Sequence, residues 1–265
     1  CPHLRVDHER FLNLLRRLRT LPGVRKVFVR SGLRYDYILL DRSAERIVQE
    51  LCKNHVSGQL KVAPEHASRR VTEIMGKPDI SVFRKFRELF FRTAESLGMR
   101  QFLVPYLMSS HPGCALEDAI ELALFVKEMG YTPEQVQDFM PTPGSLSTCI
   151  YYTGVDPRNG TKVTVVRGDR EKRMQRALMQ FARPENHRIV EEALRLAKRE
   201  DLIGKDPSRC LIRNGTRAGA TDQRAIRRPS KNRADAFEPR AETNSRAPST
   251  ERRRKSGGSR RPSGK

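Results

Sequence analysis

The sequence has little of what defines several common classes of protein. It contains no tryptophan and only five cysteines, and no two of these cysteines form a Cys-x-x-Cys pair. Dispersed cysteines in an odd number argue against a secreted disulfide framework, so we expect a cytoplasmic protein in a reducing compartment. No apolar run approaches the roughly 18 residues that a membrane-spanning helix requires, so we expect no membrane partner.

Several sequence motifs of well-known enzymes are also missing. There is no Gly-x-x-x-x-Gly-Lys-Ser/Thr loop, no His-Glu-x-x-His pair and no Gly-x-Ser-x-Gly elbow. No turn between a strand and a helix is rich enough in glycine to bind a phosphate through backbone amides, so an ordinary phosphate-binding α/β enzyme ranks last. The start, Cys1 to Leu4, contains neither an initiator methionine nor the pattern of a signal peptide. We therefore interpret the chain as the C-terminal piece of a longer protein.

The sequence does not predict a metal site. Two pairs, Cys52 with His55 and His111 with Cys114, each place two potential ligands three residues apart. A structural zinc site requires four ligands, so the two pairs would have to meet in space. One pair is expected at the end of a helix and the other after a strand. Buried, unreactive cysteines are the simpler interpretation.

Positive charge is abundant and unevenly distributed. The chain has 52 Lys and Arg against 31 Asp and Glu, a formal net charge of +21. Residues 213–265 hold 16 of these basic residues and five acidic ones, with a single aromatic residue, Phe237. Such a segment cannot bury enough apolar surface to offset its ordering entropy, so we predict a disordered basic tail. A solvated extension is the favoured interpretation, and weak nucleic-acid contact through phosphates is the alternative.

The rest of the chain predicts alternating strands and helices. Apolar periodicity and helix-end signals indicate helices over 7–20, 43–55, 80–97 and 117–129 and strands over 24–29, 59–63, 101–108 and 135–140. Successive strand–helix units of this kind form a parallel sheet, either open or curled into a barrel, and four units do not close a barrel.

After residue 149 the pattern changes. Residues 151–155 and 161–166 flank Asn159-Gly160 and predict a hairpin. Two short amphipathic helices follow, and Pro184 separates them. We therefore predict an α/β body over 1–149, a small α+β region over 150–212 and the tail over 213–265.

Candidate functional residues cluster where the predicted strands end. Ligands of parallel α/β sheets bind at the carboxyl ends of strands, because loops there change without disturbing the core. Glycine and proline in such loops are also ordinary punctuation, and a single histidine there is commonly bonded to the backbone. The candidates are Arg34 and Asp36 after the first strand, Glu65 and His66 after the second, and His111 and Gly113 after the third.

Several motifs in register carry a resemblance to a known family. They run in order from Cys1 to about Ile212, so they cover nearly all of the sequence before the tail. The chain resembles the YgiQ family of radical SAM proteins in Cys1-Pro2-His3-Leu4, Ser31-Gly32-Leu33-Arg34-Tyr35-Asp36, Leu60-Lys61-Val62-Ala63-Pro64-Glu65-His66, Ser110-His111-Pro112-Gly113, Gln135-Val136-Gln137-Asp138-Phe139, Pro141-Thr142-Pro143-Gly144, Tyr151-Tyr152-Thr153-Gly154 and Asp201-Leu202-Ile203-Gly204.

The resemblance implies a fold, a chemistry and a set of contacts. It implies the last four units of a partial (β/α) barrel that holds a [4Fe–4S] cluster and S-adenosylmethionine, and that abstracts a hydrogen atom from an unknown substrate. By this resemblance Glu65 and His66 contact the ribose or the amino-acid portion of the cofactor. His111 and Gly113 approach its adenine or backbone, and Arg34 and Asp36 contact substrate or a carboxylate.

One element of that family is absent from the sequence. The cluster of such enzymes is held by a Cys-x-x-x-Cys-x-x-Cys loop, and this sequence contains none. We therefore expect the isolated chain to be a catalytically inactive fragment, without an assigned catalytic residue and without a metal ligand of its own. The alternative function is that of a nucleic-acid-binding protein acting through the basic tail.

Overall fold

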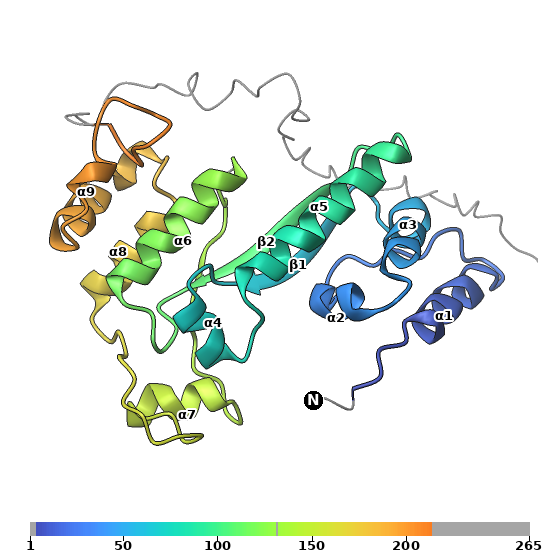
Figure 1. Cartoon of the computed structure of the whole chain (residues 1–265), viewed down its shortest axis with the longest axis horizontal. Helices are drawn as coiled ribbons and strands as arrows, with labels where there is room; N and C mark the ends of the chain where they lie inside the picture. Colours follow the sequence, from blue (N-terminus) through green and yellow to red (C-terminus); the bar gives the residue numbers. More distant parts are fainter. Residues whose placement is uncertain (1–3, 131, 214–265) are drawn as a thin grey trace, which may run out of the picture. The chain divides into compact units, whose positions relative to one another are not determined.

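A parallel sheet of three strands organises the structure, in the order β1 (Gln59–Glu65), β2 (Phe102–Ser109) and β3 (Gln137–Asp138). The computed structural model describes residues 4–130 and 132–213, which all lie in one compact unit of the chain (Figure 1). Both strand pairs are parallel, with Leu60 beside Leu103 and Ser109 beside Asp138. The predicted parallel α/β arrangement is therefore confirmed. The tail beyond residue 213 lies outside the described residues.

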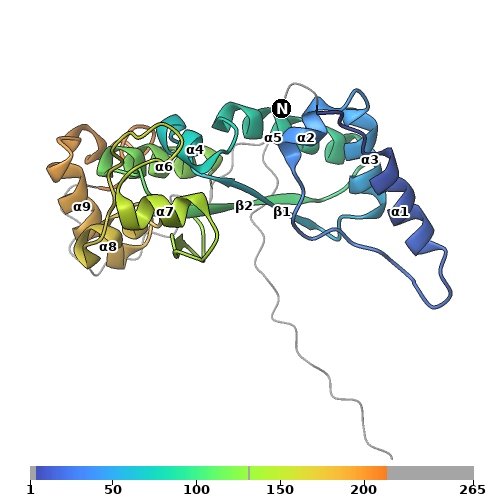
Figure 2. The ribbon, with the colours of Figure 1, turned by 90° about the horizontal axis from the view of Figure 1, so that it is seen from below.

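Helices cover one side of the long strand pair. On β1, Leu60 and Val62 are buried whereas Lys61 between them is half-buried, as alternation along a strand requires. The covering helix α5 (Ile80–Ser96) connects β1 to β2 and buries Phe83, Phe86 and Phe90. Figure 2 shows α5 on one side of β1 and β2. On the opposite face of β2, Tyr106 is 47% exposed within the described structure.

The prediction of a strand over 24–29 is wrong. This segment is extended and lies beside β1, but it makes too few ladder bonds to count as one. The Val29 amide donates to the His55 carbonyl at the end of α3 (2.8 Å), and only the next residue, Arg30, accepts from Lys61 of β1 (2.9 Å). The β-branched residues of this segment predicted its extended backbone correctly, but the backbone pairing that defines a strand is missing.

The predicted strand over 135–140 contracts to two residues. Gln137 and Asp138 pair with Met108 and Ser109, and the Phe139 amide then donates to Ser109 (2.8 Å). Proline cannot donate a ladder hydrogen bond, and Pro141 follows closely. The strand is therefore short, although its position and direction are as predicted.

The helices of the body match the predicted pattern closely. Helices α1 (Glu9–Arg19), α3 (Ala44–Asn54), α5 and α6 (Leu116–Met129) fall within one or two residues of their predicted bounds. The sequence analysis missed two short ones, α2 (Tyr35–Leu40) and α4 (Arg69–Met75). Helix α2 packs the Tyr35 ring edge-on against Phe83 of α5, with a centroid distance of 5.8 Å. None of the helices in the described parts of the chain has the length and apolar character to cross a membrane.

The region after residue 145 is more helical than predicted. Residues expected to form the first hairpin strand belong instead to α7 (Leu146–Thr153), because Ser145 caps its start and Gly154, with φ of 68°, ends it. One antiparallel bridge between Val155 and Lys162 is what remains of the hairpin. The two predicted helices are present as α8 (Asp169–Met179) and α9 (His187–Leu196), joined by a short turn at Pro184–Asn186.

Candidate functional site

The ends of β1 and β2 share an unusual backbone conformation. Glu65, the last residue of β1, has φ of 67°, and Ser110, directly after β2, has φ of 59°. Left-handed backbone is uncommon for residues other than glycine and costs free energy, so surrounding contacts must maintain it. Because the strands are parallel neighbours, both turns occur at the same edge of the sheet. This edge is where the sequence analysis placed its candidate residues.

The side chain of Glu65 lines a cavity beside this edge. Its carboxylate lies 3.5 Å from the ammonium group of Lys77, which also donates to the Ala63 carbonyl (3.2 Å). The other five predicted site residues do not line this cavity. Glu65 is therefore the predicted residue placed best to meet a ligand.

His66 is sealed inside the protein with a defined protonation state. Its Nδ1 accepts the Ser68 backbone N–H (3.0 Å), so the ring proton sits on Nε2, which faces Cys114 Sγ at 3.4 Å. The Cys114 thiol in turn lies 3.2 Å from Gln175 Oε1 and donates to it. Burial lowers the pKa of His66 to about 4, so the ring is neutral at pH 7.

Gln175 joins helix α8 to the loop after β2. Its side-chain oxygen accepts the Ser110 backbone N–H (2.8 Å), and its side-chain nitrogen donates to the Cys114 carbonyl (3.1 Å). The residue is completely buried. A buried amide that satisfies two backbone groups fixes the strained turn at Ser110 in place. Sequence reasoning missed Gln175, because a glutamine in an amphipathic helix carries no signal of this contact.

A buried carboxylate supports the loop after β1. Asp118, in the first turn of α6, accepts hydrogen bonds from Ser68 Oγ (2.7 Å), the Ala115 backbone N–H (2.8 Å) and Arg70. Burial opposes its ionisation, but the hydrogen bonds from Arg70 and Ser68 outweigh burial and lower the pKa of Asp118. The loops that follow β1 and β2 are thereby held to the same helix.

His111 is bound within its own loop and to α7. Its Nδ1 donates to the Pro112 carbonyl (2.8 Å), so Nε2 is free to accept the Ser147 hydroxyl (2.8 Å). The ring packs edge-on against Phe139, with centroids 5.0 Å apart. Burial lowers the pKa of His111 to about 4. The structure thus brings His66 and His111 to one buried cluster through Cys114, whose amide donates to the His111 carbonyl (2.9 Å).

Gly113 packs against the protein itself. Its φ is 88°, and its amide donates to the Thr164 carbonyl at 2.7 Å. A Cβ placed on Gly113 would lie 2.2 Å from the Ile74 Cδ1 atom. The glycine is therefore needed for contact between its loop and α4, and its approach to a ligand stays a prediction.

Arg34 and Asp36 lie apart from the histidine cluster and bind each other. The guanidinium of Arg34 donates twice to the Asp36 carboxylate (2.9 and 2.6 Å) and stacks on the Tyr37 ring at 4.1 Å. Burial opposes ionisation of Asp36, but the Arg34 hydrogen bonds lower its pKa overall. Among the described residues, no hydrogen bond or ion pair joins Arg34 or Asp36 to His66 or His111. Tyr35 between them is buried, and its hydroxyl has no partner in the described chain.

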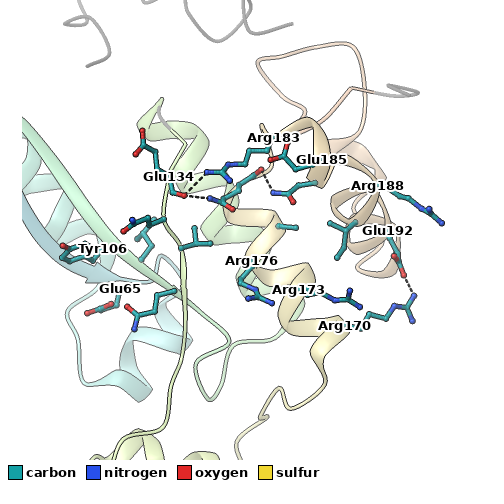
Figure 3. Close-up of a pocket in the computed structure, with 18 residues that line it drawn as sticks. Glu65, Tyr106, Glu134, Arg170, Arg173, Arg176, Arg183, Glu185, Arg188 and Glu192 are labelled. Carbon is teal, nitrogen blue, oxygen red and sulfur yellow. Dashed lines mark hydrogen bonds and ion pairs between the residues drawn. The ribbon is translucent and has the colours of Figure 1, made fainter. Parts of the chain in front are cut away.

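The cavity beside Glu65 has a volume of about 1210 Å³, and its 18 lining residues include five arginines and four glutamates. Figure 3 shows Arg176, Arg173 and Arg170 following one another along α8. Arg183 and Arg188, from the turn before α9 and from α9 itself, complete the set. The sequence analysis missed these residues, although their spacing of three along a predicted helix was a usable signal. Glu134, Glu185 and Glu192 also line the cavity.

The described residues do not fit an iron–sulfur cluster. Such a cluster requires several thiolates together, and no group of three His, Cys, Asp or Glu side chains in the described chain is arranged to hold a metal. Burial raises the pKa of Cys52 to about 12 and raises that of Cys114 further, so both stay protonated thiols. Cys149 is exposed and Cys210 is half-buried. No step of a reaction is therefore assigned to a cluster in this chain.

Comparisons with known proteins cover both the sheet and the C-terminal helices. Residues 134–265 match the family described as "Domain of unknown function (DUF3362)", which includes β3 and α7 to α9. A UPF0313 protein of Clostridium perfringens strain 13 is 57% identical over 214 residues. These are 81% of this chain and 32% of the relative. A UPF0313 protein of Clostridium botulinum strain 657 is 55% identical over 212 residues, 80% of this chain and 33% of the relative.

The chain is a homologue of the UPF0313 proteins. UPF0313 is the YgiQ family, so the resemblance predicted from the sequence motifs is confirmed at the level of the family name. The chain spans about a third of the length of the curated UPF0313 relatives that it matches. The UPF0313 and DUF3362 descriptions give no activity, and the activity of the whole protein is therefore a matter of proposal.

Proposed function

We propose that this chain is the later part of a radical SAM enzyme of the YgiQ type. In this proposal its strands are the last units of a partial barrel, and the edge that carries Glu65 faces S-adenosylmethionine and the substrate. The reaction is hydrogen abstraction from a substrate of unknown identity. The [4Fe–4S] cluster that supplies the electron for this chemistry is held by a cysteine loop elsewhere in the longer protein.

The one-sided parallel sheet is the observation that supports this proposal most strongly. Parallel sheets are normally covered on both faces, either by helices or by the packed interior of a barrel. Here α5 covers one face, whereas Tyr106 on the other is 47% exposed and has Lys61 above its ring at 5.5 Å. An interior-facing barrel surface, lined by polar side chains, suits this arrangement.

Two orphaned hydroxyl groups further support a site that other groups complete. Tyr35 Oη and Ser110 Oγ are buried and have no hydrogen-bond partner in the described chain. A buried hydroxyl without a partner costs about 1–3 kcal/mol. A ligand or a further part of the protein at the carboxyl edge would satisfy them. Ser110 lies directly at this edge, so the residues present fit a polar ligand such as S-adenosylmethionine.

We assign the predicted residues different roles on this basis. Glu65 contacts the ribose hydroxyls or the amino group of S-adenosylmethionine, because its carboxylate lines the cavity. His66 and His111 are positioning residues, because their rings are buried and bonded within the protein. Gly113 keeps the loop close to α4. Arg34 and Asp36 contact substrate or a carboxylate from the opposite end of the edge.

The test uses the full-length relative from Clostridium perfringens, reconstituted anaerobically with iron and sulfide. Under reduction it should cleave S-adenosylmethionine, measured as release of 5′-deoxyadenosine. Changing the residue that aligns with Glu65 to alanine should lower this release at least tenfold. The matched control changes the residue that aligns with Glu73 to alanine, because Glu73 of the present chain is exposed and paired with Arg69 on α4. A reconstituted relative that releases no 5′-deoxyadenosine would contradict the proposal.

The present chain provides the second arm of that test. After the same reconstitution it should stay colourless and should not cleave S-adenosylmethionine, because its described residues include no set of cluster ligands. A brown chain with bound iron and sulfide would show that the cluster is held within residues 1–265.

Nucleic-acid binding through the basic tail is the second candidate function. The observation that favours it is the excess of eleven positive charges in residues 213–265. Except for Arg213, these residues lie outside the described structure, so this stays a prediction. The chain should be retained on an immobilised polyanion at low salt, and deletion of 213–265 should lower the salt concentration at which it elutes. An elution position that the deletion leaves unchanged would contradict tail binding.

A further inference from the structure

A row of aromatic rings leads from the buried histidine cluster to the surface. His111 contacts Phe139 (5.0 Å between centroids), Phe139 contacts Tyr151 (5.8 Å), and Tyr151 contacts Tyr152 (5.3 Å, nearly perpendicular). The last ring, Tyr152 of α7, is 66% exposed. An exposed tyrosine at the end of a packed row is rigid on its inner side and open on its outer side. This is the arrangement of a surface on which a planar group can stack.

Two cations flank this row. Arg167 lies over the Tyr151 ring at 5.1 Å, and the ammonium of Lys172 lies at 5.9 Å from the same ring. Arg167 also donates to the carbonyls of Tyr151 (2.6 Å) and Tyr152 (3.2 Å), which end helix α7. These bonds hold the guanidinium over the half-buried Tyr151 ring, next to the exposed Tyr152. The surface therefore combines an aromatic face with fixed positive charge.

Side-chain contacts link the aromatic row to the helix that borders the cavity. Asp138, the residue before Phe139, pairs with Arg176 of α8 at 3.3 Å, and Arg176 lines the cavity. Lys172, above Tyr151, belongs to the same helix. The cavity and the aromatic row therefore both contact helix α8.

The cavity contains arginines without partners. Arg170 is paired with Glu192, and Glu65 is paired with Lys77. In contrast, neither Arg173 nor Arg188 forms an ion pair or a hydrogen bond within the described chain, and both are exposed. A guanidinium presents a planar fork of donors that matches a phosphate group. The cavity volume of about 1210 Å³ exceeds the roughly 300–1,000 Å³ of most small-molecule sites, so it admits more than one nucleotide unit.

We propose that this surface binds single-stranded nucleic acid. Arg173 and Arg188 contact consecutive phosphates in the cavity, and a base stacks on the outer face of Tyr152. The site lies in the folded chain and is separate from the basic tail. Binding of a nucleic-acid strand to this surface does not depend on the proposed radical SAM function. Binding is measured without S-adenosylmethionine or a cluster, so failure of either proposal is recognised separately.

The first test compares charge-matched variants of the whole chain. Binding of a labelled single-stranded oligonucleotide of about ten nucleotides is followed by fluorescence anisotropy over a range of salt concentrations. The double variant Arg173→Gln, Arg188→Gln should lower affinity at least tenfold and reduce the slope of log K against log salt by about 1.4, for two phosphates. The control Arg10→Gln, Arg19→Gln removes the same charge from exposed positions of α1 and should change affinity less than twofold. Equal losses in both variants, or none in either, would overturn the proposal.

The second test separates stacking from charge. Tyr152→Ala should weaken oligonucleotide binding about tenfold with an unchanged salt slope, because stacking does not depend on ion release. Phe28→Ala is the matched control, since Phe28 is an exposed aromatic with Lys26 beside it, outside the cavity. Inorganic polyphosphate carries the charge without bases, so Tyr152→Ala should leave its binding unchanged. An equal loss for polyphosphate and oligonucleotide would contradict stacking.

A third measurement tests whether the surface binds a nucleic-acid strand or a single free nucleotide. A mononucleotide should compete at least a hundredfold more weakly than the oligonucleotide, because it occupies one arginine and one ring at a time. Competition with equal potency would show that the site binds single nucleotides and would overturn the proposal of a strand. Circular dichroism of each variant checks that the fold is retained.

Discussion

Two regions along the same sheet edge differ in what their polar groups do. In the loops after β1 and β2, His66 and His111 are buried and bonded to the protein, and burial holds their pKa values near 4. Across the cavity, Arg173 and Arg188 of the C-terminal helices are exposed and have no bonded partner in the described chain. The histidine rings are therefore occupied by contacts within the protein, whereas the two arginine side chains are not. Position at a strand end alone does not separate the two roles.

The largest effect of a single substitution is expected at the buried amide of Gln175, which joins the two regions. Gln175→Ala should destabilise the chain by about 3–5 kcal/mol, because the buried Ser110 N–H and Cys114 carbonyl lose their partner and a cavity remains. Urea unfolding measures the change. As a control, Gln180→Ala removes a half-buried amide bonded to Pro133 and Glu134 carbonyls, and should cost about 1 kcal/mol. Similar losses of unfolding free energy in both variants would mean that the buried hydrogen bonds of Gln175 contribute no more to stability than the half-buried ones of Gln180.

The second expectation concerns pH and the sealed histidines. Burial depresses the folded-state pKa of both His66 and His111 from about 6.5 to about 4, so the unfolded chain binds more protons between these values. The free energy of unfolding should therefore fall as the pH is lowered from 6.5 towards 4, by roughly 3 kcal/mol for each histidine. Urea unfolding at several pH values tests this. Stability that is flat between pH 6.5 and 5 would show that these rings are protonated in the folded protein.

Gly113 offers an intermediate effect that separates packing from ligand binding. Gly113→Ala should cost about 2 kcal/mol, because φ is 88° and the new methyl group meets Ile74. Adding Ile74→Val should restore part of that loss by removing the Cδ1 atom that clashes. Thermal unfolding of the single and double variants measures the recovery. If Ile74→Val gives no recovery, the glycine is required for its backbone conformation alone.

The smallest effect is expected at the remaining predicted pair. Arg34→Ala should change stability by less than about 1 kcal/mol, because the Arg34 side chain is 51% exposed and solvent screens its bond to Asp36. Chemical unfolding at low and high salt measures it, and the difference should shrink further at high salt. A loss above 2 kcal/mol would show that this pair supports the buried Tyr35 beside it.

The elements that the sequence predicted well are those whose burial pattern is local. Alternation at Leu60 and Val62 and the stripe of phenylalanines on α5 follow directly from which face is buried. The segment 24–29 has the β-branched residues of a strand but lacks the hydrogen-bond ladder, which depends on partners far along the chain. Helix α7 was missed because Tyr151 and Tyr152 favour strands, whereas its capping residues decide the outcome.

The candidate site was predictable in part for the same reason. Strand ends could be located from the sequence, and Glu65 does line a cavity there. The sequence could not show that His66 is enclosed by Cys114 and Gln175, because these contacts join residues 48 and 61 positions apart. The spacing of the arginines on α8 could be seen in the sequence. Their position close to β3 could not, because it depends on how distant parts of the chain pack together.

The reach of Gln175 has a consequence for how the protein is made. Its hydrogen bonds close chain segments of 61 and 65 residues, so they form only after α8 has left the ribosome. Long-range closures of this kind are slow, because their entropy is lost before their contacts are gained. Until then the turn after β2 lacks the hydrogen bonds of Gln175. A nascent chain stalled before α8 would therefore expose the carboxyl edge of the sheet to chaperones and proteases.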